Sequence, residues 1–275
     1  MGKQSPGRRP LAELRTGYDA AADGWDAGPG PIYQPLAQAL VTAAPVPLTG
    51  RVILDLGAGT GAAGQAAVAA GARQVVAADL SIAMLRRHAV KATDATGGPA
   101  WYPVAAGAAA LPFRDGCFDL VLAAFCLNHL SRLDTALAEL RRVGAALAAS
   151  TFAPGWTHPA KDAVDEAARS FGYRPPPWYQ ALAPGERASD PQELAACATA
   201  AGFTHVRVNP VTVPTPVATP AALAAWRLGL AHYGPFLHTL GAQERIALRR
   251  AAEQAVAASG ATTPLTVEMT VLTAN

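Results

Sequence analysis

The 275-residue sequence contains only three cysteines, Cys117, Cys126 and Cys197, and none of them forms a C-x-x-C pair. This scarcity predicts neither a disulfide framework nor a cysteine-based zinc site. No apolar run approaches the roughly 20 residues needed to cross a bilayer, and residues 1–10 lack the apolar core of a signal peptide. We therefore expect no metal, no membrane partner and a cytoplasmic location, with residues 1–10 as a disordered leader.

The sequence also lacks an excess of charge of either sign. It has 22 basic and 20 acidic residues and a formal net charge of +2. Several arginines occur as isolated pairs, namely Arg8-Arg9, Arg86-Arg87, Arg141-Arg142 and Arg249-Arg250. A nucleic-acid enzyme usually carries a clustered basic stripe instead, so we expect no nucleic-acid partner. With 51% apolar residues, a chain of this length can form one large α/β domain with its own core.

Short apolar runs alternate with helical patterns along the middle of the chain. The expected strands are 51–56, 74–79, 101–105, 118–123 and 145–151, and the helices between them are 62–70, 81–92 and 134–143. This alternation is typical of an α/β fold, a parallel sheet with helices on both faces. The flanking elements are expected to be helices 11–27, 31–44, 159–171, 190–201, 219–240 and 242–259, and strands 203–209 and 265–273.

We predict a single domain over residues 11–275. Its parts are expected to be N-terminal helices at 11–47, a cofactor-binding core at 48–210, a helical insert at 211–262 and a last strand at 263–275. The insert begins with a proline-rich segment that we interpret as a stiff connector: Pro210, Pro214, Pro216 and Pro220. The insert would either shape a substrate pocket or form a dimer surface, so a monomer and a homodimer both remain open.

The strongest motif follows the first expected strand and opens a helix: Val52-Ile-Leu-Asp55-Leu-Gly57-Ala-Gly59-Thr-Gly61. Glycines there allow a tight turn and a close approach of the backbone to a ligand. A loop of this kind can bind the pyrophosphate of a dinucleotide at the helix N-terminus, and Gly57-x-Gly59-x-x-Ala62 nearly fits that pattern. The carboxylate of Asp55 would repel a pyrophosphate, whereas it suits a cofactor that carries an ammonium and a sulfonium.

The segment Asp55–Gly61 resembles motif I of the class I S-adenosylmethionine-dependent methyltransferases. Asp79 resembles the family's ribose-binding acid, about twenty residues past Gly59. The segments Ser81-Ile-Ala-Met84-Leu, Leu111-Pro-Phe113, Phe118-Asp-Leu-Val121 and Ala200-Ala-Gly-Phe203 resemble further blocks of the small-molecule members that act in quinone and natural-product biosynthesis. The resemblance covers about 15–210. It implies a Rossmann-like, mostly parallel seven-stranded sheet, N-terminal lid helices and a helical insert before the last strand.

The resemblance also implies the cofactor, S-adenosyl-L-methionine, which leaves as S-adenosyl-L-homocysteine. The residues that it assigns to cofactor binding are Tyr18, Asp55, Gly57, Ala58, Gly59, Gly61, Asp79, Leu80, Met84, Gly107, Ala108 and Ala124. Two features depart from the family pattern. Gly107 stands where an acidic residue often contacts the adenine amino group, so adenine recognition would use backbone groups around Gly107 and Ala108, or another side chain. The loop after Val143 is also shorter than usual.

We expect methyl transfer to an oxygen, nitrogen or carbon atom of a small aromatic or apolar metabolite. Such a displacement depends mainly on proximity and orientation, so no fixed catalytic motif is required. His129 and His158 follow strands four and five at the carboxyl edge, which makes them candidate bases. The predicted substrate contacts are Trp25, Tyr33, Phe125, His129, Trp178, Tyr179 and His232. Alternatively, these histidines and aromatic residues serve packing.

Other functions remain open on the sequence. A nicotinamide-dependent oxidoreductase would use a similar sheet, although Asp55 and Gly61 argue against it. A non-catalytic paralogue that binds S-adenosylmethionine is kept open by Gly107 and the short loop after Val143. A protein substrate is a further alternative.

Overall fold

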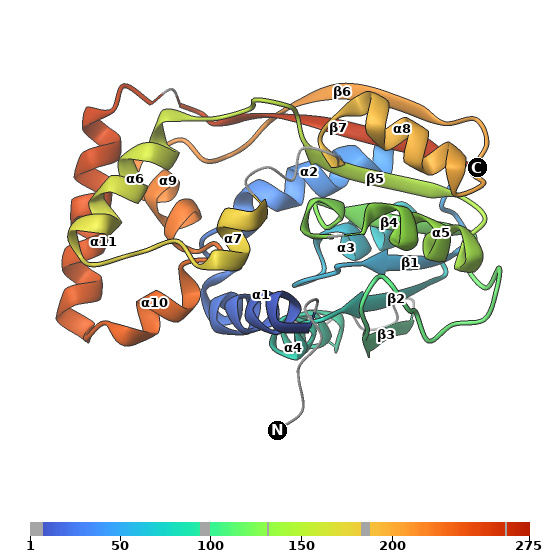
Figure 1. Cartoon of the computed structure of the whole chain (residues 1–275), viewed down its shortest axis with the longest axis horizontal. Coiled ribbons are helices and arrows are strands. Elements are labelled where there is room, and N and C mark those ends of the chain that lie inside the picture. Colours follow the sequence, from blue (N-terminus) through green and yellow to red (C-terminus); the bar gives the residue numbers. More distant parts are fainter. Residues whose placement is uncertain (1–7, 94–99, 131, 183–187, 262) are drawn as a thin grey trace. The chain divides into compact units, whose positions relative to one another are not determined.

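The structure, a computed structural model, describes residues 8–93, 100–130, 132–182, 188–261 and 263–275 (Figure 1). The chain separates into two compact units. We call residues 33–156, 185–213 and 267–275 the sheet unit. Residues 1–32, 157–184 and 214–266 are called the helical unit. The prediction that residues 11–275 form one domain stays a prediction.

The sheet unit is built on a seven-stranded sheet with the order β3-β2-β1-β4-β5-β7-β6. The strands are β1 (Val52–Leu56), β2 (Gln74–Asp79), β3 (Ala100–Ala105), β4 (Leu120–Ala124), β5 (Leu147–Phe152), β6 (Arg207–Pro214) and β7 (Thr266–Ala274). Strands β1 to β5 pair in parallel, and β7 runs antiparallel to β5. The predicted mostly parallel, seven-stranded α/β fold is therefore confirmed.

Helices cover both faces of this sheet. They are α2 (Gly30–Thr42), most of which lies in the sheet unit, α3 (Ala62–Ala69), α4 (Ile82–Thr93), α5 (Leu133–Val143) and α8 (Pro191–Ala200), together with the 3-10 turn η2 (Leu127–His129). Val76 of β2 shares a buried cluster with Leu137 of α5 and Leu194 of α8. The next residue, Ala77, packs with Leu85 of α4. Because successive strand residues point to opposite faces, α4 lies on the other face from α5 and α8.

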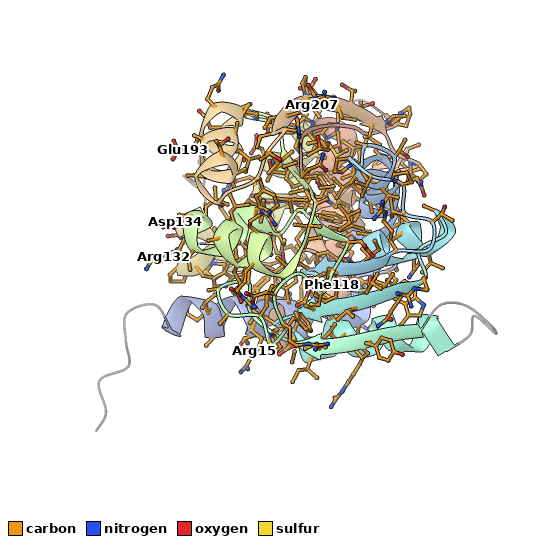
Figure 2. All side chains as sticks on the ribbon, turned by 90° about the vertical axis from the view of Figure 1, so that its right-hand side faces the viewer. Arg15, Phe118, Arg132, Asp134, Glu193 and Arg207 are labelled. Atoms are coloured by element: carbon orange, nitrogen blue, oxygen red, sulfur yellow. The ribbon has the colours of Figure 1, made fainter. Side chains whose placement is uncertain are left out.

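The same helices keep charged residues away from the core. Figure 2 shows Arg132 and Asp134 near the start of α5, and Glu193 on α8, pointing outward from the ribbon. Phe118, just before β4, is buried instead, and its ring meets that of Phe113 edge-on at 5.0 Å. This arrangement reflects the amphipathic patterns in the sequence.

The strand order places the candidate site. The chain runs from β1 outward through β2 to β3, and then returns to the other side of β1 as β4 and β5. This reversal leaves a topological switch point between β1 and β4. In open α/β sheets, ligands bind at such a point, beyond the carboxyl ends of the strands.

The helical unit contains α1 (Arg8–Ala21), η1 (Ala22–Gly24), α6 (Pro159–Ser170), α7 (Pro177–Leu182), α9 (Pro220–Leu228), α10 (Gly234–Thr239) and α11 (Ala242–Ala258). Helix α11 packs against α6 and α9, and α1 packs against α7 and α10. Gly17 lets α1 approach the segment that precedes α10, because a Cβ at Gly17 would lie 2.8 Å from the carbonyl oxygen of Ala231. Within the described parts of both units, no helix is both long and apolar enough to cross a membrane.

Several elements differ from the expected ones. The strand expected at 203–209 lies at Arg207–Pro214, so Pro210 and Pro214 belong to β6 rather than to a connector. Proline cannot donate a backbone hydrogen bond, but β6 is an edge strand, where this is tolerated. The opposite edge strand, β3, likewise contains Pro103.

The helical unit also corrects two boundaries. The expected helix at 219–240 is divided into α9 and α10, with Gly229 at the end of α9 and Gly234 at the start of α10. Helix α1 begins at Arg8, within residues 1–10, which were expected to form a disordered leader. Residues 1–7 lie outside the described residues.

Candidate functional site

The glycine loop joins β1 to α3 at the switch point. Gly57, Gly59 and Gly61 have φ angles of 65°, 53° and 91°, which L-residues rarely adopt. The N–H groups of Gly57 and Ala58 both donate to the carbonyl oxygen of Ala78 at the end of β2, at 2.8 and 3.2 Å. These backbone bonds anchor the start of the loop to the end of β2.

Gly57 is required for a second reason. A Cβ at this position would lie 2.5 Å from the Cβ of Cys126, a distance that forbids any side chain. Cys126 follows β4, so the missing side chain lets the segments after β1 and β4 come together. Desolvation of the Cys126 thiol, together with the nearby carboxylates of Asp55 and Asp79, raises its pKa well above the usual range. Cys126 is thus an inert neighbour of the loop.

Asp55, at the carboxyl end of β1, is a buried carboxylate with no cationic partner among the described residues. Its side chain is 1% exposed. Oδ2 accepts a hydrogen bond from the N–H of Gly64 at 2.8 Å, and Oδ1 has no partner among the described residues. Burial, with a smaller contribution from Asp79, raises the pKa of Asp55 to about 7. A bound cationic group would satisfy Oδ1 and stabilise the charge.

Asp79, at the carboxyl end of β2, organises the neighbouring backbone. Oδ2 accepts a 2.8 Å hydrogen bond from the N–H of Gly59, and Oδ1 accepts one of 2.7 Å from the N–H of Ser81. Its carbonyl oxygen accepts from the N–H of Ala106 at 3.0 Å. Asp79 therefore connects the glycine loop, the start of α4 and the segment after β3. Each carboxylate oxygen can accept more than one hydrogen bond, which fits the predicted ribose contact.

The residues predicted beside the adenine surround this segment. A Cβ built on Gly107 would meet only one atom within 4 Å, Leu80 Cδ2 at 3.4 Å. Gly107 forms an isolated antiparallel bridge with Ala110. Ala108 and Met84 are buried, Met84 completely. The packing role of Met84 is therefore visible, and its adenine contact stays a prediction.

The segment after β4 contains the predicted base. Ala124 ends β4, and Phe125 adopts a left-handed φ of 53° while its N–H donates to the carbonyl oxygen of Ser150 at 2.9 Å. His129 ends the turn η2. Burial lowers the pKa of His129 to about 4, so the imidazole is neutral near pH 7 and is a weak base.

An aromatic cluster gathers at the carboxyl ends of β4 and β5. Phe125 meets Phe152 at a ring-centroid distance of 4.7 Å and Tyr33 edge-on at 5.5 Å, and Phe152 stacks on Trp156 at 4.9 Å. Tyr33 and Phe125 were predicted to contact substrate, whereas Phe152 and Trp156 were missed. Their position just after an expected strand could have identified them, since the carboxyl edge is where α/β sites form.

Two further buried polar atoms in this unit escaped sequence reasoning. Ser150 Oγ in β5 and Asn128 Oδ1 in η2 have no hydrogen-bond partner among the described residues. Most buried polar atoms are hydrogen-bonded, so such exceptions concentrate where ligands bind. The polar pair Ser150-Thr151 at the end of an otherwise apolar strand was the available signal.

The remaining predicted residues lie in the helical unit. The rings of Tyr18 and Trp25 lie 5.7 Å apart, and Tyr18 packs on the buried cluster of Leu14, Trp178 and Ala231. Trp178 and Tyr179, which were predicted to contact substrate, lie on α7, and those contacts stay a prediction. Pro177, whose fixed φ suits a first helical turn, begins that helix.

His158 takes a structural position. It is the N-cap of α6, where its Nδ1 accepts a hydrogen bond from the N–H of Ala160 at 3.3 Å. A ring that caps a helix has one nitrogen already committed. This geometry shows a capping role that the sequence did not predict, and the role of His158 as a base stays a prediction.

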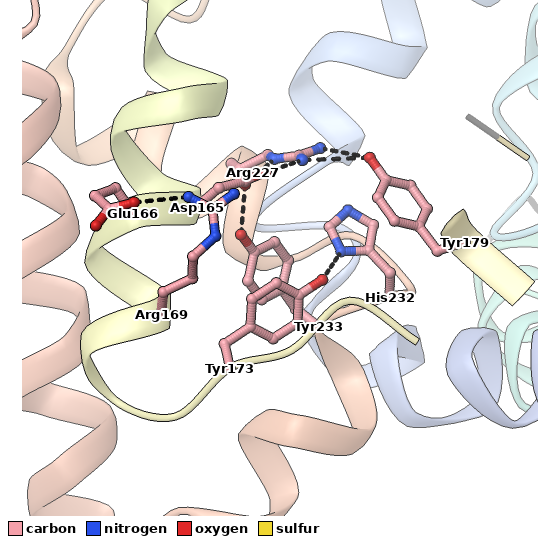
Figure 3. A network of polar contacts seen from close by, with 8 residues as sticks. All are labelled: Asp165, Glu166, Arg169, Tyr173, Tyr179, Arg227, His232 and Tyr233. Carbon is pink, nitrogen blue, oxygen red and sulfur yellow. Dashed lines mark hydrogen bonds and ion pairs between the residues drawn. The ribbon is translucent and has the colours of Figure 1, made fainter. Parts of the chain in front are cut away.

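A buried polar network fills the helical unit (Figure 3). Arg227, 4% exposed, donates two 2.7 Å hydrogen bonds to Asp165, which also accepts one of 2.6 Å from the hydroxyl of Tyr233. The guanidinium donates to the hydroxyl of Tyr179 at 3.2 and 3.3 Å. His232 lies beside this group. The sequence had singled out only His232 and Tyr179.

Comparisons with known proteins agree with this geometry. Residues 53–145 match the model of a methyltransferase domain. The chain is 42% identical over 95 residues to the demethylmenaquinone methyltransferase of Thermobifida fusca, an alignment that covers 34% of this chain and 39% of that protein. It is 34% identical over 161 residues to the malonyl-[acyl-carrier protein] O-methyltransferase of Halorhodospira halophila, which covers 56% and 52%. The chain thus spans about half or less of these relatives' lengths.

A solved structure extends the similarity in fold. The Haemonchus contortus phosphoethanolamine N-methyltransferase 2, solved with phosphomonomethylethanolamine and S-adenosylhomocysteine, aligns with a TM-score of 0.57 and 16% identity. The alignment covers 93% of this chain and 57% of that one. At this identity the similarity establishes the fold alone.

Proposed function

We propose, from the match of residues 53–145 to the model of a methyltransferase domain, that the protein is a class I S-adenosylmethionine-dependent methyltransferase that acts on a small molecule. One observation supports the cofactor most directly. Asp55 holds a buried carboxylate beside the glycine loop, and its Oδ1 has no partner among the described residues. A pyrophosphate would be repelled there, whereas an ammonium group would be bound.

The residues of the sheet unit fit the rest of S-adenosylmethionine. The glycine loop and Asp55 would hold its amino-acid part, Asp79 the ribose hydroxyls, and the segment of Gly107 and Ala108 the adenine. Leu80, Met84 and Ala124 would complete the surroundings. When bound, the cofactor supplies an electrophilic methyl group on a sulfonium. The protein then has to orient the acceptor and exclude water, which accounts for much of the rate of such a displacement.

For the acceptor side, we propose that the rings of Tyr33, Phe125, Phe152 and Trp156 line a site for an aromatic or apolar metabolite. Their mutual contacts of 4.7 to 6.5 Å support this assignment. His129, neutral near pH 7, would accept a proton from a hydroxyl acceptor.

The short loop after α5 does not argue against activity. Only residues 144–146 separate α5 from β5. Gly144 fits this tight connection, because a Cβ there would lie 2.5 Å from Val121 Cγ2, and its N–H donates to the carbonyl oxygen of Leu140 at 2.9 Å. The connection is therefore well packed, and we take it as a structural variation.

The test is calorimetric titration with S-adenosylhomocysteine, with NADH and NADPH as controls. We expect micromolar or tighter binding of S-adenosylhomocysteine alone. Acceptors can then be screened for a one-methyl increase in mass in the presence of S-adenosylmethionine. Binding of a nicotinamide nucleotide instead would refute the proposal. Cofactor binding without methylation of any acceptor would favour the non-catalytic paralogue.

A further inference from the structure

The segment proposed to bind adenine contains no side chain that forms hydrogen bonds. We call residues 106–113 the adenine segment; its sequence is Ala106-Gly-Ala-Ala-Ala-Leu-Pro-Phe113. Any polar contact that this segment makes with a purine therefore uses backbone N–H and C=O groups. Such groups bind one arrangement of donors and acceptors well when they are held in place before the ligand arrives, because no ordering of the chain is then needed.

The start of the adenine segment is attached to β2. The N–H of Ala106 donates to the carbonyl oxygen of Asp79 at 3.0 Å. Within the segment, the N–H of Ala110 donates to the carbonyl oxygen of Gly107 at 3.2 Å and closes a turn. The segment therefore begins at the residue that is proposed to hold the ribose.

Two side chains of α5 hold the other end of the adenine segment. Glu139 Oε1 accepts a hydrogen bond from the N–H of Leu111 at 2.7 Å. The guanidinium of Arg142 donates to the carbonyl oxygens of Leu111 and Phe113 at 3.1 and 2.8 Å. The side chain of Leu111 is buried in the same hydrophobic cluster as Leu140 of α5. One helix thus fixes three backbone groups of the segment.

Arg142 uses its whole guanidinium in this arrangement. Besides the two carbonyl oxygens, it donates two hydrogen bonds of 2.6 and 2.8 Å to the carboxylate of Glu139 and one of 2.7 Å to Asp115. These bonds hold the pKa of Glu139 below its usual value, so the pair is ionised near neutral pH. An arginine has five N–H donors, and all of them are occupied here. A simple surface ion pair needs far fewer.

We propose that Glu139 and Arg142 are positioning residues that fix the adenine segment and thereby let its backbone distinguish adenine from other purines. The inference rests on the proposed methyltransferase function and adds to it two residues that act through the backbone they hold. Adenine donates from its 6-amino group and accepts at N1, whereas hypoxanthine accepts at O6 and donates at N1. A fixed backbone matches one pattern and leaves polar groups unpaired with the other.

The test compares S-adenosylhomocysteine with S-inosylhomocysteine, which carries hypoxanthine in place of adenine. By calorimetry we expect the unaltered protein to bind the adenine compound at least about tenfold more tightly. Arg142→Lys should weaken S-adenosylhomocysteine binding about tenfold and reduce the preference to about threefold or less, because a lysine ammonium cannot reproduce the planar fork. Loss of a purely structural contact would weaken both compounds equally and leave their ratio unchanged.

The neighbouring residue Arg141 provides the matched control. It donates to the carbonyl oxygens of Gly202 and Gly144, at 3.1 and 3.3 Å, away from the adenine segment. Arg141→Lys therefore removes a comparable pair of backbone contacts from the same turn of α5 and should leave the preference unchanged. If Arg142→Lys does not fold, as judged by circular dichroism, Glu139→Gln replaces it. That variant loses the charge that orients Arg142 and should lower the preference by about twofold or more.

Amide hydrogen exchange of the free protein gives a second readout that needs no ligand. We expect residues 106–113 to exchange several-fold faster in Arg142→Lys than in the unaltered protein, because their anchor to α5 is weakened. Arg141→Lys should show no such change. The glycine loop, residues 57–61, should exchange at the same rate in all three proteins.

Four results would overturn the inference: no preference in the unaltered protein, an unchanged preference in Arg142→Lys, an equal loss of preference in Arg141→Lys, or unchanged exchange of residues 106–113. Failure of the proposed function has a different signature. The unaltered protein would then bind neither compound, and the inference would fall with the function. Binding of both compounds, with a ratio that Arg142→Lys does not change, would refute the positioning role alone.

Discussion

Each unit shields an aspartate from solvent, Asp165 partly and Asp55 almost completely, and the two carboxylates have different partners. In the helical unit, Asp165 receives two 2.7 Å hydrogen bonds from Arg227 and one of 2.6 Å from Tyr233. In the sheet unit, Asp55 receives one hydrogen bond of 2.8 Å, from a backbone N–H, and burial raises its pKa to about 7. Asp165 is paired with Arg227, whereas Asp55 has no cation beside it in the part of the chain that the structure describes.

The difference separates a structural carboxylate from a ligand-binding one. A buried charge with an internal partner can be stable in the free protein. A buried charge without an internal partner destabilises the free protein. Binding of a cationic ligand removes this unfavourable free energy and thereby increases the affinity for that ligand. The predictions below change one side of this comparison at a time.

The largest effect is expected at Arg227. Arg227→Leu leaves Asp165 buried without a cation, and we expect it to lower the free energy of unfolding by about 3–5 kcal/mol. Urea denaturation monitored by circular dichroism measures the change. Arg169→Ala removes an exposed ion pair with Glu166 on the same helix as Asp165 and should leave the midpoint unchanged. A small effect at Arg227 would mean that Asp165 tolerates burial as Asp55 does.

The opposite behaviour is expected at Asp55. Asp55→Asn can keep the hydrogen bond from Gly64 but loses the charge, so we expect S-adenosylhomocysteine to bind about 10- to 100-fold more weakly. The unfolding free energy at pH 8 should stay the same or rise, because a destabilising buried charge is gone. A loss of stability together with affinity would show that Asp55 is structural.

Asp55 should also make the stability of the protein and its affinity for S-adenosylhomocysteine depend on pH. In the unfolded chain Asp55 loses its proton near pH 4, whereas in the fold it keeps the proton until about pH 7. Its contribution to stability is therefore present at low pH and is lost as the pH rises from about 4 to 7. Binding needs the charged form, so affinity for S-adenosylhomocysteine should rise with pH up to about 7 and then level off. Asp55→Asn should flatten this profile, which calorimetry between pH 5.5 and 8.5 can follow.

At Asp79 we expect a smaller loss. Asp79→Ala removes the acceptor for Gly59 and Ser81 and the predicted partner of the ribose hydroxyls, and it should weaken S-adenosylhomocysteine binding at least about tenfold. The affinity of Asp79→Asn, which retains one side-chain oxygen, should lie between those of the unaltered protein and Asp79→Ala. Equal affinities for all three proteins would refute the ribose assignment.

The smallest effect is expected at His129. His129, with a pKa lowered to about 4, is a weak base, so His129→Ala should reduce kcat by about tenfold at most. Cofactor affinity should change by less than about twofold. If calorimetry instead shows that affinity collapses, His129 belongs to the cofactor site or to the fold rather than to proton transfer.

Local patterns predicted the sheet unit well. Asp55, the three glycines and Asp79 lie within 25 residues of one another, and each occupies a strand end or turn that its own residue type specifies. The alternation of strands and helices then predicted the parallel sheet. The edge strand β6 was displaced because Pro210 and Pro214 were interpreted as ending a strand, whereas an edge position tolerates them.

The helical unit was harder to predict because its contacts are distant in sequence. Asp165 and Arg227 are 62 positions apart, and Asp165 and Tyr233 are 68 apart. Each of these residues alone resembles an ordinary polar residue on a helix. Phe152 and Trp156 were missed for a related reason, since their role depends on Tyr33 and Phe125 arriving from other segments.

The prolines of the two edge strands have a consequence for association. A free sheet edge presents unpaired backbone groups that can recruit a strand from another molecule and start aggregation. Here β3 contains Pro103, and β6 contains Pro210 and Pro214, so each outer edge lacks donors at those positions. Growth of the sheet by addition of strands is therefore disfavoured at these positions of both edges.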